Sequence, residues 1–141
     1  MDFRDHFFSL EGRIARLPFL GGLLLLTAIS GVVSMIGAAQ IWVHRGTAGA
    51  SVVLVLMAAA ALVNAWTALA LYAKRLHDLG ASGWLGVPIL AAGIVGLATG
   101  SILSMGFGLV AAITLCLAPG ESGQNRWGPA PGTEDEAWSP Q

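Results

Sequence analysis

Three long stretches of this chain contain no aspartate, glutamate, lysine or arginine. They cover residues 17–43, 46–73 and 79–120, and most of their side chains are apolar. Because a helix rises about 1.5 Å per residue, roughly 20 apolar residues cross a hydrocarbon core of about 30 Å. The first two stretches therefore each predict one membrane-spanning helix. The third is about twice as long as one crossing needs, and it predicts two short crossings joined by a turn.

Prolines and glycines indicate where these helices begin and end. Pro18 fits the first turn of a helix, and Gly80 fits the left-handed residue that commonly follows one. Pro88 lies slightly too deep for a first-turn proline, which predicts a kink or a late start of the third helix. The sequence thus predicts an all-α, polytopic membrane protein with four transmembrane helices. Their approximate ranges are 17–43, 50–75, 84–100 and 103–118.

The chain has room for one domain and a tail. We expect residues 1–131 to form a single four-helix transmembrane domain. Residues 132–141 include three consecutive acidic residues, at positions 134–136, and are typical of a short, disordered acidic tail. The segment before the first helix carries acidic as well as basic residues, and the apolar run after it is longer than the roughly 7–15 residues of a secretory signal. We therefore expect the first helix to be retained.

Composition supports a membrane protein and excludes several function classes. Hydrophobic residues make up 55% of the chain and charged residues 11%, whereas about a quarter of the residues in a soluble domain are charged. The net charge of −1 offers no basic stripe for binding nucleic acid. The histidines His6, His44 and His77 lack the spacing of zinc ligands. We expect no nucleic-acid partner, no metal and no cofactor.

The basic residues predict the orientation in the membrane, because they concentrate on the cytoplasmic side of spanning helices. With four crossings, Arg45 stands alone on one side. The other side holds Arg4, Arg13, Arg16, Lys74, Arg75 and Arg126. This asymmetry predicts a multi-pass protein with both termini in the cytoplasm.

Small residues at four-residue spacing predict where helices pack together in lipid. Such stripes occur at positions 30, 34 and 38, at positions 92, 96, 100 and 104, and at positions 108, 112 and 116. They favour helix contacts, either within the bundle or between two copies. Asn64 is the one strongly polar side chain deep in a predicted span. It is interpreted as an interhelical hydrogen-bonding group or as a ligand for a substrate or ion.

The remaining polar chemistry lies in three segments, residues 8–16, 74–84 and 119–129, which the predicted topology places at the cytoplasmic ends of the helices. We expect them to form one candidate interfacial patch, made of Arg13, Arg16, Arg75, His77, Asp78, Asn125 and Arg126. Arg75 and Asp78 are three residues apart, so they can face each other on a helical turn. Asp78 is the only acid of its segment, and any of the patch arginines is a candidate partner.

The same segments carry a family resemblance. GRIAR at residues 12–16, KRLHDLGASGW at 74–84 and PGESGQNRWGPAP at 119–131 resemble the hallmarks of the bacterial inner-membrane family catalogued as domain of unknown function 805. The resemblance covers about residues 3–131, and the middle motif is the most specific. It implies a four-helix protein of the bacterial inner (plasma) membrane, with no established biochemical activity and no catalytic residues to transfer.

Several functions of the patch stay open at this point. The patch is one of three things: a structural cluster that holds the loop ends and the tail together, a site for anionic lipid head groups, or a catalytic or transported-substrate site. Because His77 and Asp78 are adjacent, they point about 100° apart on a helix and do not face each other. The sequence therefore predicts no catalytic residue, and we do not expect an enzyme.

The leading hypothesis is a non-enzymatic membrane component that interacts with lipids, with another membrane protein or with a second copy of itself. The alternative is a channel or small-solute transporter subunit that acts as an oligomer, with Asn64 and Thr67 lining the path. The surroundings of Asn64 distinguish the two. A hydrated cavity would favour the channel, and contact with another helix would favour the leading hypothesis.

Overall fold

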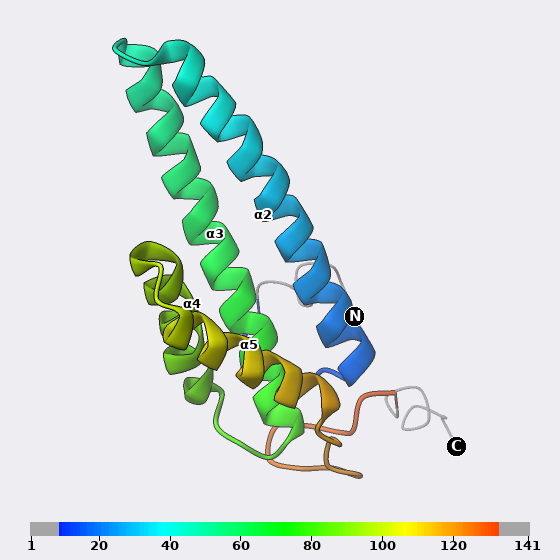
Figure 1. Cartoon of the computed structure of the whole chain (residues 1–141). Coiled ribbons are helices and arrows are strands. Elements are labelled where there is room, and N and C mark those ends of the chain that lie inside the picture. The colour runs from blue at the N-terminus through cyan, green and yellow to red at the C-terminus, as the bar shows by residue number, and fades with distance from the viewer. Residues whose placement is uncertain (1–8, 133–141) are drawn as a thin grey trace, which may run out of the picture.

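The computed structural model describes residues 9–132 (Figure 1). Its helices are α2 (Arg16–His44), α3 (Ala48–Asp78), the short 3₁₀ helix η1 (Gly83–Leu85), α4 (Gly86–Thr99) and α5 (Ile102–Leu117). β structure within this range is limited to one isolated bridge, between Asn125 and Gly128. The predicted all-α class and its four helices are confirmed. The predicted acidic tail, apart from Gly132, lies outside the described residues.

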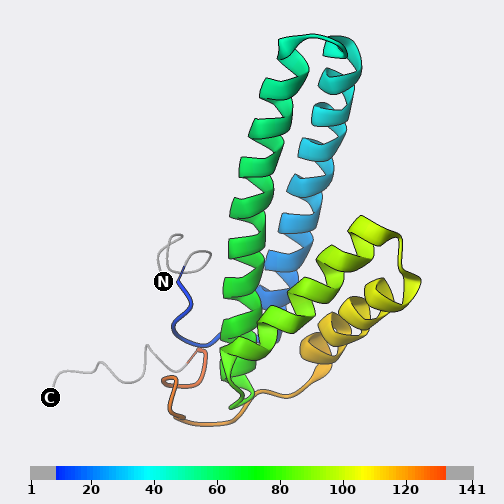
Figure 2. The same cartoon turned by 90° about the vertical axis from the view of Figure 1, so that its left-hand side faces the viewer.

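The helices form two antiparallel hairpins of unequal length (Figure 2). With 29 and 31 residues, α2 and α3 extend about 43 and 46 Å at 1.5 Å per residue. Both are long and apolar enough to cross a membrane. With 14 and 16 residues, α4 and α5 extend only about 21 and 24 Å. Each is apolar but shorter than the roughly 20 residues that a crossing needs.

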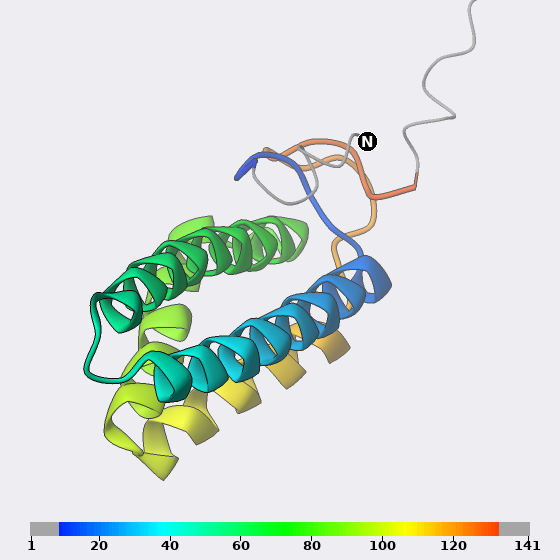
Figure 3. The same cartoon turned by 90° about the horizontal axis from the view of Figure 1, so that it is seen from above.

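Both hairpins meet at one end of the molecule, which we call the polar end. The start of α2, the end of α3, the start of α4 and the end of α5 all lie there (Figures 1 and 2). From the polar end the short hairpin leans away from α2 and α3 (Figure 2). In the view from above, α5 lies behind α2 (Figure 3). The turn of the short hairpin reaches only to the middle part of the long hairpin (Figures 1 and 2).

Backbone geometry at the polar end follows the glycine and proline signals. Gly80 adopts a φ of 70°. Its N–H donates to the carbonyl oxygen of His77 (3.1 Å), and Ala81 N–H donates to that of Leu76 (2.9 Å), which is the Schellman pattern that ends a helix. The third helix starts late, because η1 precedes it and Pro88 falls in the first turn of α4, where a proline breaks no helical hydrogen bond.

Glycines let α2 and α3 approach closely. Gly22 and Gly37 are the buried glycines of α2. A Cβ atom at Gly22 would lie 2.9 Å from the Cδ1 of Leu71, and one at Gly37 would lie 2.7 Å from the Cε of Met57. Ser34 and Ala38 of the predicted stripe are exposed instead. On the contact face of α2, Gly22 and Gly37 thus each lie about two turns from Ser30, one on either side. The face does not have one small residue per turn.

Asn64 packs against a neighbouring helix. Its Nδ2 donates to the Oγ of Ser30 on α2 (2.5 Å), and Ser30 Oγ in turn donates to the carbonyl oxygen of Leu26 (2.6 Å).

Small residues let α4 and α5 approach each other closely within the short hairpin. A Cβ at Gly96 would lie 2.7 Å from the backbone nitrogen of Met105. The predicted stripe through position 96 therefore forms a helix contact inside the chain.

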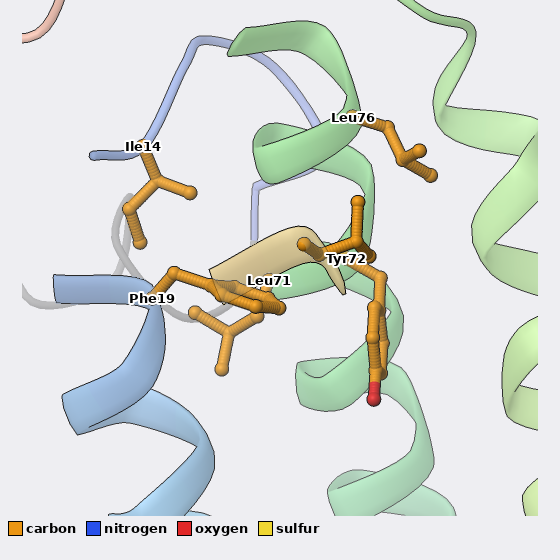
Figure 4. Close-up of a cluster of buried hydrophobic side chains, with 6 residues drawn as sticks. Ile14, Phe19, Leu71, Tyr72 and Leu76 are labelled. Atoms are coloured by element: carbon orange, nitrogen blue, oxygen red, sulfur yellow. The ribbon is translucent and has the colours of Figure 1, made fainter. Parts of the chain in front are cut away.

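A compact apolar cluster joins the two hairpins next to the polar end (Figure 4). The segment before α2, then α2, α3 and α5 all contribute, through Ile14, Phe19, Leu71, Tyr72, Leu76 and Leu115. The rings of Phe19 and Tyr72 meet edge to face, with centroids 5.6 Å apart. Away from this cluster large apolar side chains are exposed on every helix, as expected of helices surrounded by lipid.

The Asn64–Ser30 bond gives a first prediction. Asn64→Val should lower the free energy of unfolding by about 0.5–1 kcal/mol, the usual contribution of an interhelical hydrogen bond in a membrane protein. Unfolding with sodium dodecyl sulfate in mixed micelles measures it. Ser30→Ala should cost a similar amount, and the double variant should cost no more than one of them. Ser34→Ala, an exposed serine one turn further along α2, is the control. Strictly additive losses at positions 30 and 64 would contradict the bond.

Candidate functional site

Asp78, the last residue of α3, lies between two arginines. Arg13 donates from Nε (3.1 Å) and Nη2 (3.0 Å) to Oδ1 of Asp78. Arg75, one turn earlier on α3, donates from Nη1 to Oδ2. The side chains of Arg13, Arg75 and Asp78 are 1%, 0% and 4% exposed. We call these three residues the charged cluster. Both carboxylate oxygens are bound by a guanidinium group, so the carboxylate is poorly placed to act as a base.

Arg13 also holds the segment that follows α5. Its Nη2 donates to the carbonyl oxygen of Glu121 (2.5 Å), and its Nη1 donates to those of Gly123 (2.6 Å) and Gly128 (3.3 Å). Arg13 itself lies just before α2, after Gly12, whose φ is 89°. One side chain from the amino-terminal segment thus fixes three points of a loop more than 100 residues away in the sequence.

Arg75 ties the end of α3 to the end of α5. Its Nε donates to the carbonyl oxygen of Leu115 (2.9 Å), and its Nη2 donates to that of Ala118 (2.5 Å). The last carbonyls of a helix have no partner within it, so Arg75 supplies donors that the end of α5 lacks. A third bond runs from Nη1 to the carbonyl oxygen of Ile14 (3.2 Å). Arg75 therefore joins three separate parts of the chain.

The electrostatics of the charged cluster depend on these backbone carbonyls. Two guanidinium groups and one carboxylate leave one positive charge in excess. Burying a charge costs several kcal/mol unless it is paired and hydrogen-bonded. The negative ends of six carbonyl dipoles face the guanidinium groups, those of Ile14, Leu115, Ala118, Glu121, Gly123 and Gly128. They compensate the excess charge and satisfy the arginine donors together.

Glycines make room for the carboxylates. A Cβ atom at Gly120 would collide with Oδ2 of Asp78, and one at Gly80 would collide with Oε1 of Glu121. The N–H of Glu121 donates to the carbonyl oxygen of Asp78 (2.8 Å), which brings the two chain segments into direct backbone contact. At Gly120 the obstacle is the buried carboxylate of Asp78, which is held by two arginines. At Gly80 the φ of 70° also favours glycine.

His77 and Asn125 extend the arrangement around the charged cluster. The His77 ring stacks on Trp127 with centroids 3.6 Å apart and planes 8° apart, and its Nδ1 lies 3.2 Å from the carbonyl oxygen of Gly12. Asn125 Nδ2 donates to the carbonyl oxygen of His77 (3.0 Å) and to Oε2 of Glu121 (2.8 Å). Both residues thus hold the loop after α5 against the end of α3.

Arg16 and Arg126 differ from the other patch residues because they are exposed. Arg126 lies over the ring of Trp127, with Cζ 4.9 Å from its centroid, and donates from Nη2 to the carbonyl oxygen of Gly80 (3.4 Å). Arg16 is the first residue of α2. The structure therefore brings Arg13, Arg75 and Asp78 into direct contact, and beside them Asn125 binds the backbone of His77. It leaves Arg16 and Arg126 facing outward at the same end.

The sequence did not predict the backbone carbonyl oxygens that bind the two buried arginines. Carbonyl oxygens have no residue signature, so nothing in the sequence marks those of Ile14, Leu115 and Ala118 as arginine acceptors. Nor did the sequence predict the stacking of His77 on Trp127 or the complete burial of Lys74. The one available signal was the density of glycines at 120, 123 and 128 around Arg126, which indicates close backbone approach.

Removing the Asp78 carboxylate should destabilise the protein strongly. Asp78→Asn leaves two buried guanidinium groups without an anion, and we expect a loss of about 3–5 kcal/mol in the free energy of unfolding. The control is Glu11→Gln, which removes an exposed acid from the same end and should cost less than about 0.5 kcal/mol. Unfolding in mixed micelles measures both variants. Equal losses would show that the charged cluster does not stabilise the fold.

Adding a single methyl group at Gly120 should also destabilise the protein. Gly120→Ala forces the Asp78 carboxylate or the backbone to move. We expect the free energy of unfolding to fall by about 1–3 kcal/mol. Gly106→Ala on α5 is the matched control, because a Cβ there meets nothing within 4 Å. It should be neutral or stabilising by up to about 1 kcal/mol. Equal melting temperatures for the two alanine variants would refute the steric argument.

Comparison with known proteins gives one positive result. Neither the curated proteins nor the solved structures yielded a match to the chain. A family model does match, over residues 7–129, and its description is protein of unknown function DUF805. The matched range contains every residue of the charged cluster and the polar segments 8–16, 74–84 and 119–129. It covers far more than half of the 141 residues. The chain therefore belongs to the family described as protein of unknown function DUF805.

Proposed function

We propose that this chain is a small, non-enzymatic component of the bacterial inner membrane that binds anionic lipid head groups at its cytoplasmic face. In this proposal α2 and α3 cross the membrane, and the polar end and both termini lie in the cytoplasm. One observation carries it. The motif residues of the charged cluster bind one another and the backbone, so Arg16 and Arg126 are the exposed cations of the described polar end.

The charge distribution supports this orientation. Every described lysine and arginine except Arg45 lies at or near the polar end, and Arg45 lies in the turn between α2 and α3. Basic residues close to the ends of spanning helices remain on the cytoplasmic side. A polar end in the cytoplasm satisfies this rule, and the reverse orientation would move five of the six described cations to the outer side.

The state of the chemical groups supports a non-enzymatic role. A catalytic acid or base needs a free position within hydrogen-bond reach of a substrate. Both oxygens of Asp78 are bound by arginines, and the guanidinium groups of Arg13 and Arg75 are surrounded by carbonyls. Binding a substrate at these groups would require breaking the contacts that hold the helix ends together.

The surroundings of Asn64 support a membrane component over a channel subunit. Its amide donates to Ser30 inside the contact between α2 and α3. Thr67, the other proposed lining residue, is 4% exposed, and its hydroxyl donates to the carbonyl oxygen of Val63 (2.9 Å). Asn64 therefore makes an ordinary interhelical contact, and the hydroxyl of Thr67 is bonded within α3 itself.

The exposed arginines suit phosphate groups. A guanidinium donates two parallel hydrogen bonds to a phosphate, and each basic residue near an anionic surface contributes about 1 kcal/mol of attraction. Arg16 and Arg126 stand at the level where head groups of the cytoplasmic leaflet would lie if α2 and α3 cross the membrane. Arg75 cannot take part, because its side chain is fully buried.

Lipid retention tests this proposal. Native mass spectrometry of the purified protein with phosphatidylglycerol should show about fivefold weaker retention in Arg16→Gln and in Arg126→Gln, equivalent to about 1 kcal/mol each. Arg45→Gln is the matched comparison, because Arg45 is exposed and also lies over a tryptophan, with Cζ 5.0 Å from the ring centroid of Trp42. It should retain lipid nearly as the wild type does.

Two outcomes would contradict the proposal. Equal losses in all three variants would mean that retention follows net charge and that the polar end has no preferred lipid contact. Unchanged retention in Arg16→Gln and Arg126→Gln would mean that these arginines do not contact lipid phosphates.

A further inference from the structure

The short hairpin has an unusual position for two apolar helices. We propose that α4 and α5 form a re-entrant hairpin, which enters the cytoplasmic leaflet from the polar end, turns inside the hydrocarbon and returns to the same side. Its surface would contact the acyl chains of that leaflet. This inference rests on the proposed crossing of the membrane by α2 and α3, and it replaces the two short crossings expected from the length of residues 79–120.

Length is the first argument. At about 21 and 24 Å, α4 and α5 are shorter than a hydrocarbon core of about 30 Å. They also lean away from the long hairpin, so their reach along its axis is shorter than their own length (Figure 2). If α2 and α3 cross the membrane, the turn between α4 and α5 lies at the depth of their middle part and not at their far end (Figures 1 and 2).

The start of α4 and the end of α5 are attached to α3, so the short hairpin cannot shift toward the far side of the membrane. Arg75 on α3 donates to the carbonyls of Leu115 and Ala118 at the end of α5. At the start of α4, a Cβ on Gly86 would lie 3.1 Å from the Cβ of Tyr72. Both ends are therefore attached to the last two turns of α3, within the polar end.

The hairpin surface fits hydrocarbon and not water. Neither helix contains a charged residue. Large apolar side chains around the turn are among the most exposed of the described residues, with Leu97, Ile102 and Leu103 at 76%, 84% and 87%. In water so large an apolar surface would be strongly unfavourable. Acyl chains cover it at every point along both helices.

The turn itself limits the number of free polar groups. It consists of Gly100, with a φ of 66°, and Ser101. Ser101 accepts hydrogen bonds from the backbone N–H of Ser104 at its Oγ (3.4 Å) and from that of Met105 at its carbonyl (3.0 Å). Thr99 Oγ1 donates to the carbonyl of Val95 (2.7 Å). Because these groups are hydrogen-bonded within the turn, they avoid the unfavourable free energy of an unsatisfied polar group in lipid.

A re-entrant hairpin makes the protein asymmetric across the bilayer. Four helices would displace lipid in the cytoplasmic leaflet, and only α2 and α3 would do so in the other. The acyl chains of the cytoplasmic leaflet are thus the partner of the short hairpin, in the leaflet whose head groups face Arg16 and Arg126.

Single-cysteine variants in a Cys116→Ser background test the depth of the turn. Ile102→Cys reports on the turn of the short hairpin, Arg45→Cys on the turn between α2 and α3, and Ser122→Cys on the polar end; all three positions are exposed. A membrane-impermeant maleimide is applied to spheroplasts and to inverted vesicles. A spin label on the same cysteines then reports collisions with oxygen, which is enriched in hydrocarbon, and with a water-soluble nickel chelate.

We expect Arg45→Cys to react only from outside and Ser122→Cys only from inside. Ile102→Cys should react at least about tenfold more slowly than either from both sides, because a charged probe enters hydrocarbon poorly, and its spin label should collide with oxygen rather than nickel. Reaction of Ile102→Cys from outside would show a crossing hairpin, and fast reaction from inside would show a hairpin at the surface. Protection from both oxygen and nickel would place the turn within protein.

Each of those three results would overturn the re-entrant hairpin. The positions 45 and 122 test the proposed orientation separately. If they react from the same side, or with the sides exchanged, the proposed crossing of α2 and α3 or its direction is wrong, whatever the depth at position 102.

Discussion

A single buried carboxylate, shared by two arginines, is the interaction on which the polar end depends. Asp78 closes α3, Arg13 precedes α2, and Arg75 reaches the end of α5. None of the three charges is tolerable in a buried position alone, since an unpaired buried charge costs several kcal/mol. Each guanidinium group therefore requires the carboxylate, and the carboxylate requires a guanidinium group. The positive charge in excess requires the carbonyls around them. This mutual requirement fixes how the two hairpins and the loop after α5 meet.

The same constraint explains why the polar motifs are rich in arginine and glycine. The guanidinium group has five donors in a fixed planar fork, so Arg13 binds a carboxylate and three carbonyls at once, whereas a lysine has only three donors. Gly80 and Gly120 leave the space that the carboxylates of Glu121 and Asp78 occupy. Residues that resemble a binding site in the sequence are thus used to hold chain segments together. The exposed arginines at the described polar end are Arg16 and Arg126.

Much of the fold was predictable from the sequence, because apolar length and helix-ending signals act locally. Such signals predict the four helices, the left-handed Gly80 and the late start of α4, which has Pro88 in its first turn. The pairing of Arg75 with Asp78, three residues apart, was predictable in the same way. The choice of Arg13 as the second partner was not predictable, because Arg13, Arg16 and Arg126 were equivalent by topology. Nor was the face of α2 that meets α3, since a helix that is apolar all round shows no preferred side. Apolar length also cannot give the tilt and reach of α4 and α5.

Amide hydrogen exchange of the loop after α5 tests the central claim most directly, that the charged cluster holds the chain ends together. The amides of Glu121, Asn125 and Gly128 are hydrogen-bonded within this arrangement. Arg13→Lys keeps the charge but loses the fork that binds Asp78 and three carbonyls at once. If the cluster holds the loop, these amides should exchange clearly faster in Arg13→Lys than in the wild type, while the α2–α3 pairing near Asn64 stays protected. Unchanged protection of the loop in Arg13→Lys would contradict the account.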